Sequence, residues 1–414
     1  MTFTNILSRI SSLLFGLVII VCGHTLQAWA ADFNSAPTVA TGETSPSSAV
    51  AESEFKQESS DRWSREWLES RGMSFEVTYR SEVFTNLHGG TDGQRGGEYL
   101  GSADASVTLN LAKMGLARGS VVLTGQSLHG RGINDRKVGA IQAPSNLNEA
   151  AFNKLVEVYF TDSLFHERVT FKAGRLYADA DFNAVETAGD FLNASYGLIP
   201  TILMPTYPTP QVGASVWTTI NSRVSIGAGV YGGGNLQAPG EDTSPISAGL
   251  FTIVEAKVEP FSKLSMIRGS YHFGVWQQGN GTWKAGDALA PARNYGVYAT
   301  GEHWFGKPLS SGSNVGPGVF FQAGWSPADR NEVSKYWGAG VAYAGMLQRR
   351  EHDSVGVGVT QARLETGSET VLEVFYRFQA TKKVFVQPDL QWVTKPYGNG
   401  PSALLGGLRL GIAF

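Results

Sequence analysis

The chain ends in VFVQPDLQWV-TKPYGNGPS-ALLGGLRLGIAF (residues 384–414), where two segments alternate apolar and polar side chains. In the final segment every second residue is apolar or glycine, without a break, up to the last residue. That parity holds Leu404, Gly406, Leu408, Leu410, Ile412 and Phe414. A period of two places successive side chains on opposite faces of a strand. The stretch therefore predicts a hairpin of two β-strands with one continuous apolar face.

The same alternation fills the chain from Gly72 to this hairpin and predicts about sixteen strands. They are expected near residues 74–85, 99–111, 119–129, 151–162, 167–176, 211–220, 222–231, 246–259, 263–276, 294–306, 316–326, 335–347, 353–363, 369–380, 383–395 and 402–414. Most of these segments are longer than the usual soluble strand of about 5–6 residues and suit a tilted membrane crossing of about 9–11 residues.

The connections between these strands alternate in length. Short turns are expected around 163–166, at 221, at 260–262 and at 381–382, and long loops at 86–98, 130–150, 177–210, 232–245 and 277–293. Outer-membrane barrels have an even strand number, short periplasmic turns and long external loops. The sequence therefore predicts an all-β fold, a transmembrane antiparallel β-barrel of about 16 strands with a short N-terminal helix, spanning residues 74–414.

A soluble β-sandwich or propeller is the alternative, because its strands alternate in the same way. Strand length and the absence of a blade-length repeat argue against it. Aromatic side chains also stand near predicted strand ends on the apolar parity, where the interfacial girdles of a membrane barrel lie. Examples are Trp337, Tyr343, Tyr376 and Trp392.

The N-terminus predicts export. Arg9 precedes an apolar run that is too short to span a bilayer, and Ala28-Trp29-Ala30 has small residues at the positions a signal peptidase reads. We expect a signal peptide at 1–30, cleaved near Ala30. An uncleaved anchor and a lipoprotein at Cys22 are weaker alternatives.

Two further segments precede the barrel. Residues 31–60 have few large apolar side chains and are expected to be a disordered linker. Residues 61–73 are expected to form a short helix that begins at Asp61, packs through Trp63 and Trp67, and ends at Gly72.

Composition excludes several kinds of function. Thirty-three basic and 36 acidic residues give a net charge of -3, unlike the basic surface that binds nucleic acid. The one cysteine, Cys22, lies in the expected signal peptide, so the remaining chain has no thiol for a disulfide, a nucleophile or a zinc site. We find no metal-ligand spacing and no Ser-His pair that the sequence places together, and predict no enzyme activity and no cofactor. A barrel of about sixteen strands encloses a water-filled channel, which predicts a pore.

Three stretches carry the motifs of a known family. They are Met73 to Tyr79 with the Gly-Gly pair at 89–90; Phe171 to Leu176 followed by Asp179, Asp181, Phe182, the run Phe191 to Gly197, Pro200, Pro205, Tyr207 and Pro208; and Glu373 to Tyr376, Val386 to Gln391, Pro396 and Gly398. Together they resemble the carbohydrate-selective porin family of the OprB type over nearly the whole mature chain. One departure is Ser64-Arg65, where the family has a glycine pair after the helix tryptophan.

The resemblance implies a sixteen-stranded channel for sugar diffusion in the Gram-negative outer membrane. The terminal Phe414, in phase with the last strand, is similar to the signal read by the barrel assembly machinery. Outer-membrane lipid and lipopolysaccharide are the expected surroundings. A homotrimer is the expected assembly for a wide porin, although nothing in the sequence decides it, and a monomer is the alternative.

A sugar offers hydroxyl groups on its edges and C–H groups on its faces, so selective passage needs polar side chains and an aromatic ring. The expected inward parity supplies both. Its candidates are Glu157, Tyr159, Lys172, Arg175, Glu255, Lys257, Arg268, His272, Trp276, Glu302, Glu373, Arg377, Asp389, Gln391 and Arg409. The candidate constriction in loop 177–210 comprises Tyr177, Asp179, Asp181, Phe182, Phe191, Asn193 and Tyr196.

Arg175 is the strongest candidate because it opens the longest loop. For the others, ion pairs within the wall and loop packing are the alternative interpretation. With both signs of charge facing inward, we expect passive diffusion that favours monosaccharides such as glucose. A general porin or a channel for small carboxylates is the alternative function.

Overall fold

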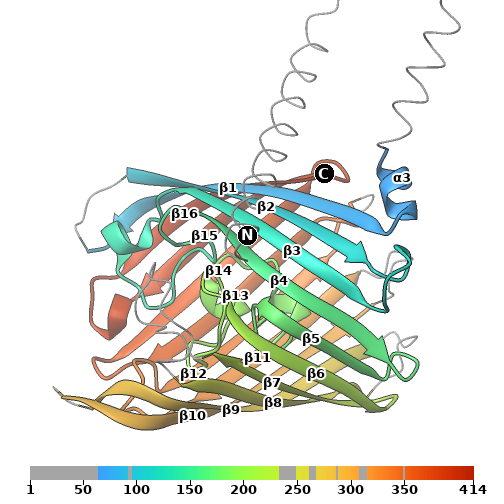
Figure 1. Ribbon diagram of the computed structural model, residues 1–414. Coiled ribbons are helices and arrows are strands. Elements are labelled where there is room, and N and C mark those ends of the chain that lie inside the picture. The colour runs from blue at the N-terminus through green and yellow to red at the C-terminus, as the bar shows by residue number, and fades with distance from the viewer. Residues whose placement is uncertain are drawn as a thin grey trace, which may run out of the picture.

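The computed structural model describes residues 64–91, 96–232, 249–260, 267–285, 288–306, 315–347 and 350–414, and side chains of 280–292 are not among the described ones. Sixteen antiparallel strands form one closed barrel, as predicted (Figure 1). The strands are β1 (Met73–Gly89), β2 (Gly96–Asn110), β3 (Ser120–Gly130), β4 (Phe152–Leu164), β5 (Val169–Leu176), β6 (Gln211–Asn221), β7 (Val224–Gly232), β8 (Leu250–Val258), β9 (Ile267–Ala285), β10 (Ala288–Phe305), β11 (Gly316–Trp325), β12 (Lys335–Ala344), β13 (Ser354–Arg363), β14 (Ser368–Gln379), β15 (Val384–Thr394) and β16 (Ala403–Ala413).

The barrel closes between its first and last strands. Tyr79 of β1 pairs with Ile412 of β16, and the backbone N–H of Phe414 donates to the carbonyl of Val77 at 2.9 Å. Closure removes the free strand edges that would otherwise pair with other chains.

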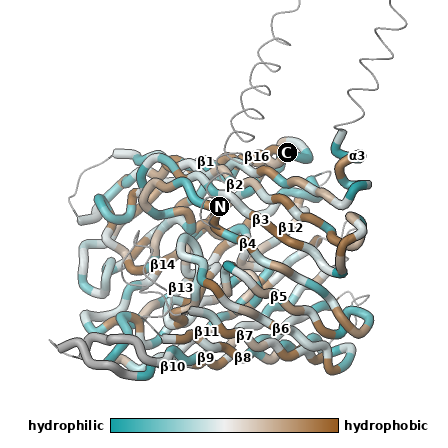
Figure 2. The backbone as a smooth tube through the Cα atoms, in the orientation of Figure 1, coloured by the Kyte–Doolittle hydropathy of each residue, from teal (hydrophilic) through white to brown (hydrophobic). Residues whose placement is uncertain are grey.

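Side chains alternate between a lipid-facing and a lumen-facing surface along every strand, and Figure 2 shows apolar and polar positions interspersed along the wall. The parity that holds Leu408 and Leu410 faces outward, and Leu408 is 52% exposed. Trp337 and Trp392 are 45% and 51% exposed on the same surface. The apolar parity of the sequence is therefore the outer surface of the barrel.

Connections differ between the two ends of the barrel. One end has the short turns 165–168, 222–223 and 380–383, and the other has the longer connections 131–151, 177–210 and 395–402. By the general rule for such barrels, the first end is periplasmic; we call it the turn end.

The predicted loop 277–293 is wrong. β9 continues to Ala285 and β10 begins at Ala288, so the two strands extend together as a long hairpin. Alternation reveals a strand only where one of its faces is apolar. Pairing of the two strands satisfies the backbone N–H and C=O groups of this extension, whether or not its side chains alternate.

A short helix precedes the barrel. α3 (Arg65–Ser70) is capped by Ser64, whose hydroxyl accepts from the N–H of Trp67 at 3.1 Å, and Gly72 ends the helical segment with a φ of +85°. The predicted signal peptide, the predicted linker and residues 61–63 of the predicted helix lie outside the described residues. Within the described part of the chain, no helix is long and apolar enough to cross a membrane.

The connection 177–210 folds into the barrel, where it forms η2 (Glu186–Ala188) and α4 (Ala194–Gly197) (Figure 1). Its apolar side chains pack against inward-facing apolar residues of the wall. The main cluster joins Phe182, Ile199, Ile202 and Met204 of the loop to Tyr231, Phe251, Ile253, Trp276, Tyr298 and Tyr336 of the wall. The main hydrophobic cluster therefore lies inside the barrel, chiefly between the loop and strands β7 to β12.

Candidate functional site

Carboxylates of the barrel wall hold the infolded loop by its backbone. Glutamates on β4, β8, β10 and β14 accept N–H groups from successive parts of the loops. The contacts are Glu157 with Tyr177 (3.2 Å), Glu255 with Asn183 (2.8 Å), Glu302 with Thr187 (2.8 Å), Glu373 with Leu192 (2.6 Å) and Asn193 (3.0 Å), and Glu369 with Ile141 (2.9 Å) and Gln142 (2.8 Å). A hydrogen bond contributes about 0.5–1.5 kcal/mol, and more where its acceptor is charged, so this series fixes the path of the loop around the lumen.

Polar wall side chains also satisfy loop carbonyls. The Tyr336 hydroxyl donates to the carbonyl of Ser195 at 2.7 Å, and the Gln322 amide donates to that of Tyr196 at 2.9 Å. The Gln391 amide donates to the carbonyl of Pro144 at 2.8 Å. Loop and wall thus form one hydrogen-bonded unit rather than a plug resting in a pore.

Many predicted site residues belong to this anchoring. Phe182, Asn193, Glu373 and Gln391 are fully buried, and Trp276 is 3% exposed. Phe191 and Tyr196 stack at 4.3 Å within the loop, Asp389 accepts from the Gln391 amide at 2.9 Å, and Asp179 accepts from the Thr206 hydroxyl at 2.6 Å. In the structure these residues pack the loop on the wall, which was the alternative to a role in contacting the solute.

Arg175 does not face the lumen. It pairs with Val158 on β4 and with Val212 on β6, whereas Lys172 pairs with Thr161. Val212 is 60% exposed on the outer surface. Residues three apart on a strand point to opposite faces, so Lys172 and Arg175 cannot both point inward. The prediction for Arg175 is therefore wrong, and Lys172 is the inward residue of the two.

The inward face of β1 to β5 is only partly covered by the loop. The Arg80 guanidinium donates to the Asp104 carboxylate at 2.9 Å, and the two side chains are 35% and 20% exposed. The Gln126 amide donates to the other Asp104 oxygen at 2.5 Å. This half of the wall presents a strip of paired donors and acceptors to the lumen.

Tyr207 of the infolded loop lies beside this strip. Its hydroxyl donates to the carbonyl of Leu147 at 3.2 Å. Burial, together with the nearby negative charges of Glu149 and Asp104, raises the pKa of Tyr207 well above that of a free phenol. Tyr207 is therefore a neutral aromatic hydroxyl at every physiological pH.

Two further inward pairs flank the loop. Lys172 donates to Asp181 at 2.5 Å and lies 5.7 Å from the ring of Tyr159. Arg377 lies 3.7 Å from Asp190 and over the ring of Phe385. Arg268 lies on the same inward face, opposite Trp304.

A large cavity opens below the loop at the turn end. Its volume is about 1130 Å³, and it lies between the wall residues Arg80 and Arg377, the loop residues Glu186 and Asp190, and the turn residue Lys382. Both signs of charge line it.

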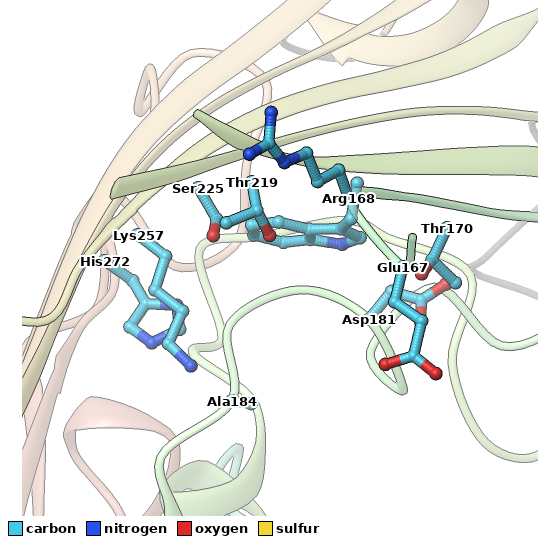
Figure 3. Close-up of a pocket in the computed structure, with 10 residues that line it drawn as sticks. Glu167, Arg168, Thr170, Asp181, Ala184, Thr219, Ser225, Lys257 and His272 are labelled. Carbon is cyan, nitrogen blue, oxygen red and sulfur yellow. The ribbon is translucent and has the colours of Figure 1, made fainter. Parts of the chain in front are cut away.

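A second, smaller cavity lies across the lumen from the first. Its volume is about 270 Å³, and strands β5 to β9 form its wall while Asp181 and Ala184 of the loop cover it. Figure 3 shows Lys257 and His272 on one side of this space and Thr170 and Asp181 on the other. Both nitrogens of His272 have partners, the Glu255 carboxylate at 2.7 Å and the Ser270 hydroxyl at 2.8 Å.

The sequence interpretation missed Arg80, Asp104, Asp190 and Tyr207. Arg80 and Asp104 stand on the inward parity of their strands, which was a usable signal, but their pairing depends on the register between β1 and β2. Asp190 and Tyr207 depend on how the loop folds. Among the residues that the structure describes, no group of three or more His, Cys, Asp or Glu side chains lies close enough together to hold a metal ion.

Comparison with known proteins agrees with this geometry. Residues 94–414 match the model of the carbohydrate-selective porin, OprB family. Porin B of Pseudomonas aeruginosa is 20% identical over 84% of this chain and 88% of its own length. The high-pH structure of Pseudomonas putida OprB superposes with a TM-score of 0.75 at 19% identity, over 84% of this chain and 96% of that one. A mutant Rh. blastica porin gives a TM-score of 0.51 at 11% identity, over 83% of this chain and the whole of the other.

The two solved structures show the shared fold, and the family match identifies the function in general terms. The matched region includes every strand from β2 to β16, together with both loops that enter the lumen. The chain therefore belongs to the OprB family of carbohydrate-selective porins, transport channels of the outer membrane.

Proposed function

We propose that this porin passes neutral monosaccharides such as glucose by passive diffusion, along the partly open face of β1 to β5. The observation that carries the proposal is the strip formed by Arg80, Asp104 and Gln126 beside Tyr207. Its donors and acceptors can exchange with successive sugar hydroxyls, and its phenol offers a ring to the C–H face.

Charge compensation supports a neutral solute. Three partly exposed inward cations stand near carboxylates: Arg80 near Asp104, Lys172 near Asp181, and Arg377 near Asp190. A ring of one sign would favour one class of ion, whereas compensated pairs favour neither. Glu157, Tyr159 and Arg377 complete the route that we propose.

Throughput requires that each contact be weak. A sugar that exchanges hydrogen bonds with water at every step meets no deep energy minimum, which is the condition for fast diffusion. The wall is already hydrogen-bonded to the loop, so passage needs no energy-driven rearrangement. Liposomes that contain only this protein should therefore swell in an isotonic solution of a permeant sugar.

Liposome swelling tests the proposal. Swelling rates should be compared for glucose, xylose, a disaccharide, arginine and succinate. We expect glucose and xylose to be fastest for the wild type. Equal rates for all small solutes would indicate a general porin, and faster succinate than glucose would indicate a carboxylate channel.

A matched pair of arginine variants locates the route. Arg80→Ala should lower the preference for glucose over arginine, since it removes one hydrogen-bond donor from the strip and leaves the negative charge of Asp104 without its cation, which favours a cationic solute. Arg175→Ala removes the same side chain from the outer surface and should leave the preference unchanged. Equal effects of the two substitutions would contradict the route along β1 to β5.

A further inference from the structure

The smaller cavity has the dimensions of a site for one small molecule. Its volume of about 270 Å³ lies near the lower end of the range of about 300–1000 Å³ for ligand sites. It is built by five consecutive strands, because Thr170, Trp217, Thr219, Ser225, Lys257 and His272 all stand on the inward parity of β5 to β9. The loop closes it toward the centre of the barrel, so it is separate from the route along β1 to β5.

An indole is available as an aromatic surface in this cavity. Trp217 pairs with Gly227 across β6 and β7, and its ring lies directly over that glycine. A Cβ on Gly227 would approach the ring at 2.3 Å, so only glycine lets the indole lie flat against the wall. Phe182 packs against the same ring at 5.6 Å, which leaves the half-buried indole held in place while it lines the cavity.

Polar groups of several kinds line the same cavity (Figure 3). Asp181 is fixed by Lys172 at 2.5 Å and by the Ser215 hydroxyl at 2.7 Å. Lys257 is 32% exposed and lies 3.3 Å from Glu259, so its ammonium can still turn toward a solute. Thr219 and Ser225 add hydroxyls that can donate or accept.

The charges of this lining compensate one another. Arg168 and Lys257 are opposed by Glu167 and Asp181, and the His272 imidazole is held by Glu255. An ion would gain little from such a lining. A fixed ring bordered by hydroxyls and single charges is the arrangement that recognises the C–H face and the edge hydroxyls of a sugar.

We propose that this cavity is a binding site for a single neutral monosaccharide at the turn end of the barrel, with Trp217 as its stacking surface. The proposal rests on the proposed function for the class of ligand. It adds a resting site beside the passage, on the turn-end side of the loop. A sugar held there leaves toward the turn end without crossing the strip at Arg80 again.

Saturation-transfer NMR with glucose tests this site on the full protein folded in detergent micelles. Loss of the stacking surface in Trp217→Ala should weaken glucose binding about 3- to 10-fold. Trp217→Phe, which keeps an aromatic ring, should restore most of the binding. Ser225→Leu keeps the indole and fills the cavity, and it should also weaken binding.

One control variant leaves both this cavity and the passage untouched. Trp392→Ala removes an indole from the outer surface and should bind glucose as the wild type does. Retention of the heat-dependent gel shift shows which variants are folded. Unchanged glucose binding in folded Trp217→Ala and Ser225→Leu, or no glucose binding by the wild type, would overturn the proposed site.

Swelling rates of the same variants separate this inference from the proposed function. If the wild type shows no sugar preference while glucose binding depends on Trp217, the proposed function fails and the site stands. If permeation is sugar-selective while binding is insensitive to Trp217, the site fails and the proposed function stands.

Discussion

The anchoring of the infolded loop can be tested at Glu302. One oxygen of this carboxylate accepts both the backbone N–H of Thr187 at 2.8 Å and the Thr187 hydroxyl at 2.7 Å. Thr187 is 2% exposed, so water does not replace the carboxylate. Two hydrogen bonds to a charged acceptor contribute about 1.5–3 kcal/mol each, so Glu302→Ala should weaken the anchoring of this segment by about 3–6 kcal/mol.

Glutamine at the same position should weaken the anchoring less. Its single carbonyl oxygen can accept both bonds, but an uncharged acceptor contributes only about 0.5–1.5 kcal/mol per bond. We therefore expect Glu302→Gln to lose about 2–3 kcal/mol, roughly half the effect of alanine. The order wild type, glutamine, alanine is the signature of a charge-assisted anchor.

Hydrogen exchange measures this anchoring directly. The amide of Thr187 should lose protection in that order, because each 1.4 kcal/mol of lost anchoring raises the open population about tenfold. A loosened loop should also admit a disaccharide faster in liposome swelling. Glu76→Ala is the matched control, since Glu76 stands on the inward parity of β1, is exposed and has no loop contact among the described residues. Unchanged exchange at Thr187 in Glu302→Ala would refute the anchoring and leave apolar packing as what holds the loop.

Two further predictions concern stability. Asp353, at the turn before β13, is buried, which disfavours its charge, but hydrogen bonds from Arg350, Tyr376 and the Gln379 N–H outweigh burial and lower its pKa. A carboxylate with a lowered pKa stabilises the folded state at pH values above its ordinary pKa of 3.8, and this stabilisation is lost as the pH falls below that value. Asp353→Asn should therefore be less stable at neutral pH and lose less stability than the wild type between about pH 6 and pH 3 in urea unfolding. Equal pH dependence of the two proteins would contradict this. Gly227→Ala should destabilise the barrel by about 1–3 kcal/mol because the new Cβ would overlap the indole of Trp217. Gly125→Ala is the control, since its Cβ meets nothing within 4 Å, and it should leave the stability unchanged. Equal unfolding midpoints of the two variants would contradict the close approach of Gly227 and Trp217.

Strand positions were predictable because burial on one face leaves a period of two in the sequence. The outward parity of β16 is visible from Leu404 to Phe414 without any knowledge of its neighbours. The extended hairpin of β9 and β10 shows the limit of this signal. Backbone pairing joins the two strands there, and backbone hydrogen bonds leave no mark in the pattern of side chains.

The sequence predicted which types of side chain face the lumen, but not which of them the loop covers. Inward parity identified Lys172 and Arg377 correctly as lumen residues, but the error at Arg175 came from treating charge as evidence of direction when strand spacing decides it. Burial by the loop was harder to foresee. A usable signal was present in Phe251 and Ile253, since inward apolar residues such as Phe251 would face water unless something covered them.

Some charged groups of the wall hold the infolded loop, and others can meet a solute. The anchoring of the loop therefore affects the selectivity of the channel. Wall carboxylates such as Glu302 and Glu373 are occupied by loop amides and are unavailable to a passing solute. Several partly exposed charges already have an opposite charge nearby, and Arg80 with Asp104 is such a pair, with side chains 35% and 20% exposed. A dicarboxylate on this route would have to displace Asp104 from Arg80 and gain only the difference between two similar interactions. A neutral sugar exchanges hydrogen bonds with the same pair without separating the charges, and this difference favours sugars over ions of equal size.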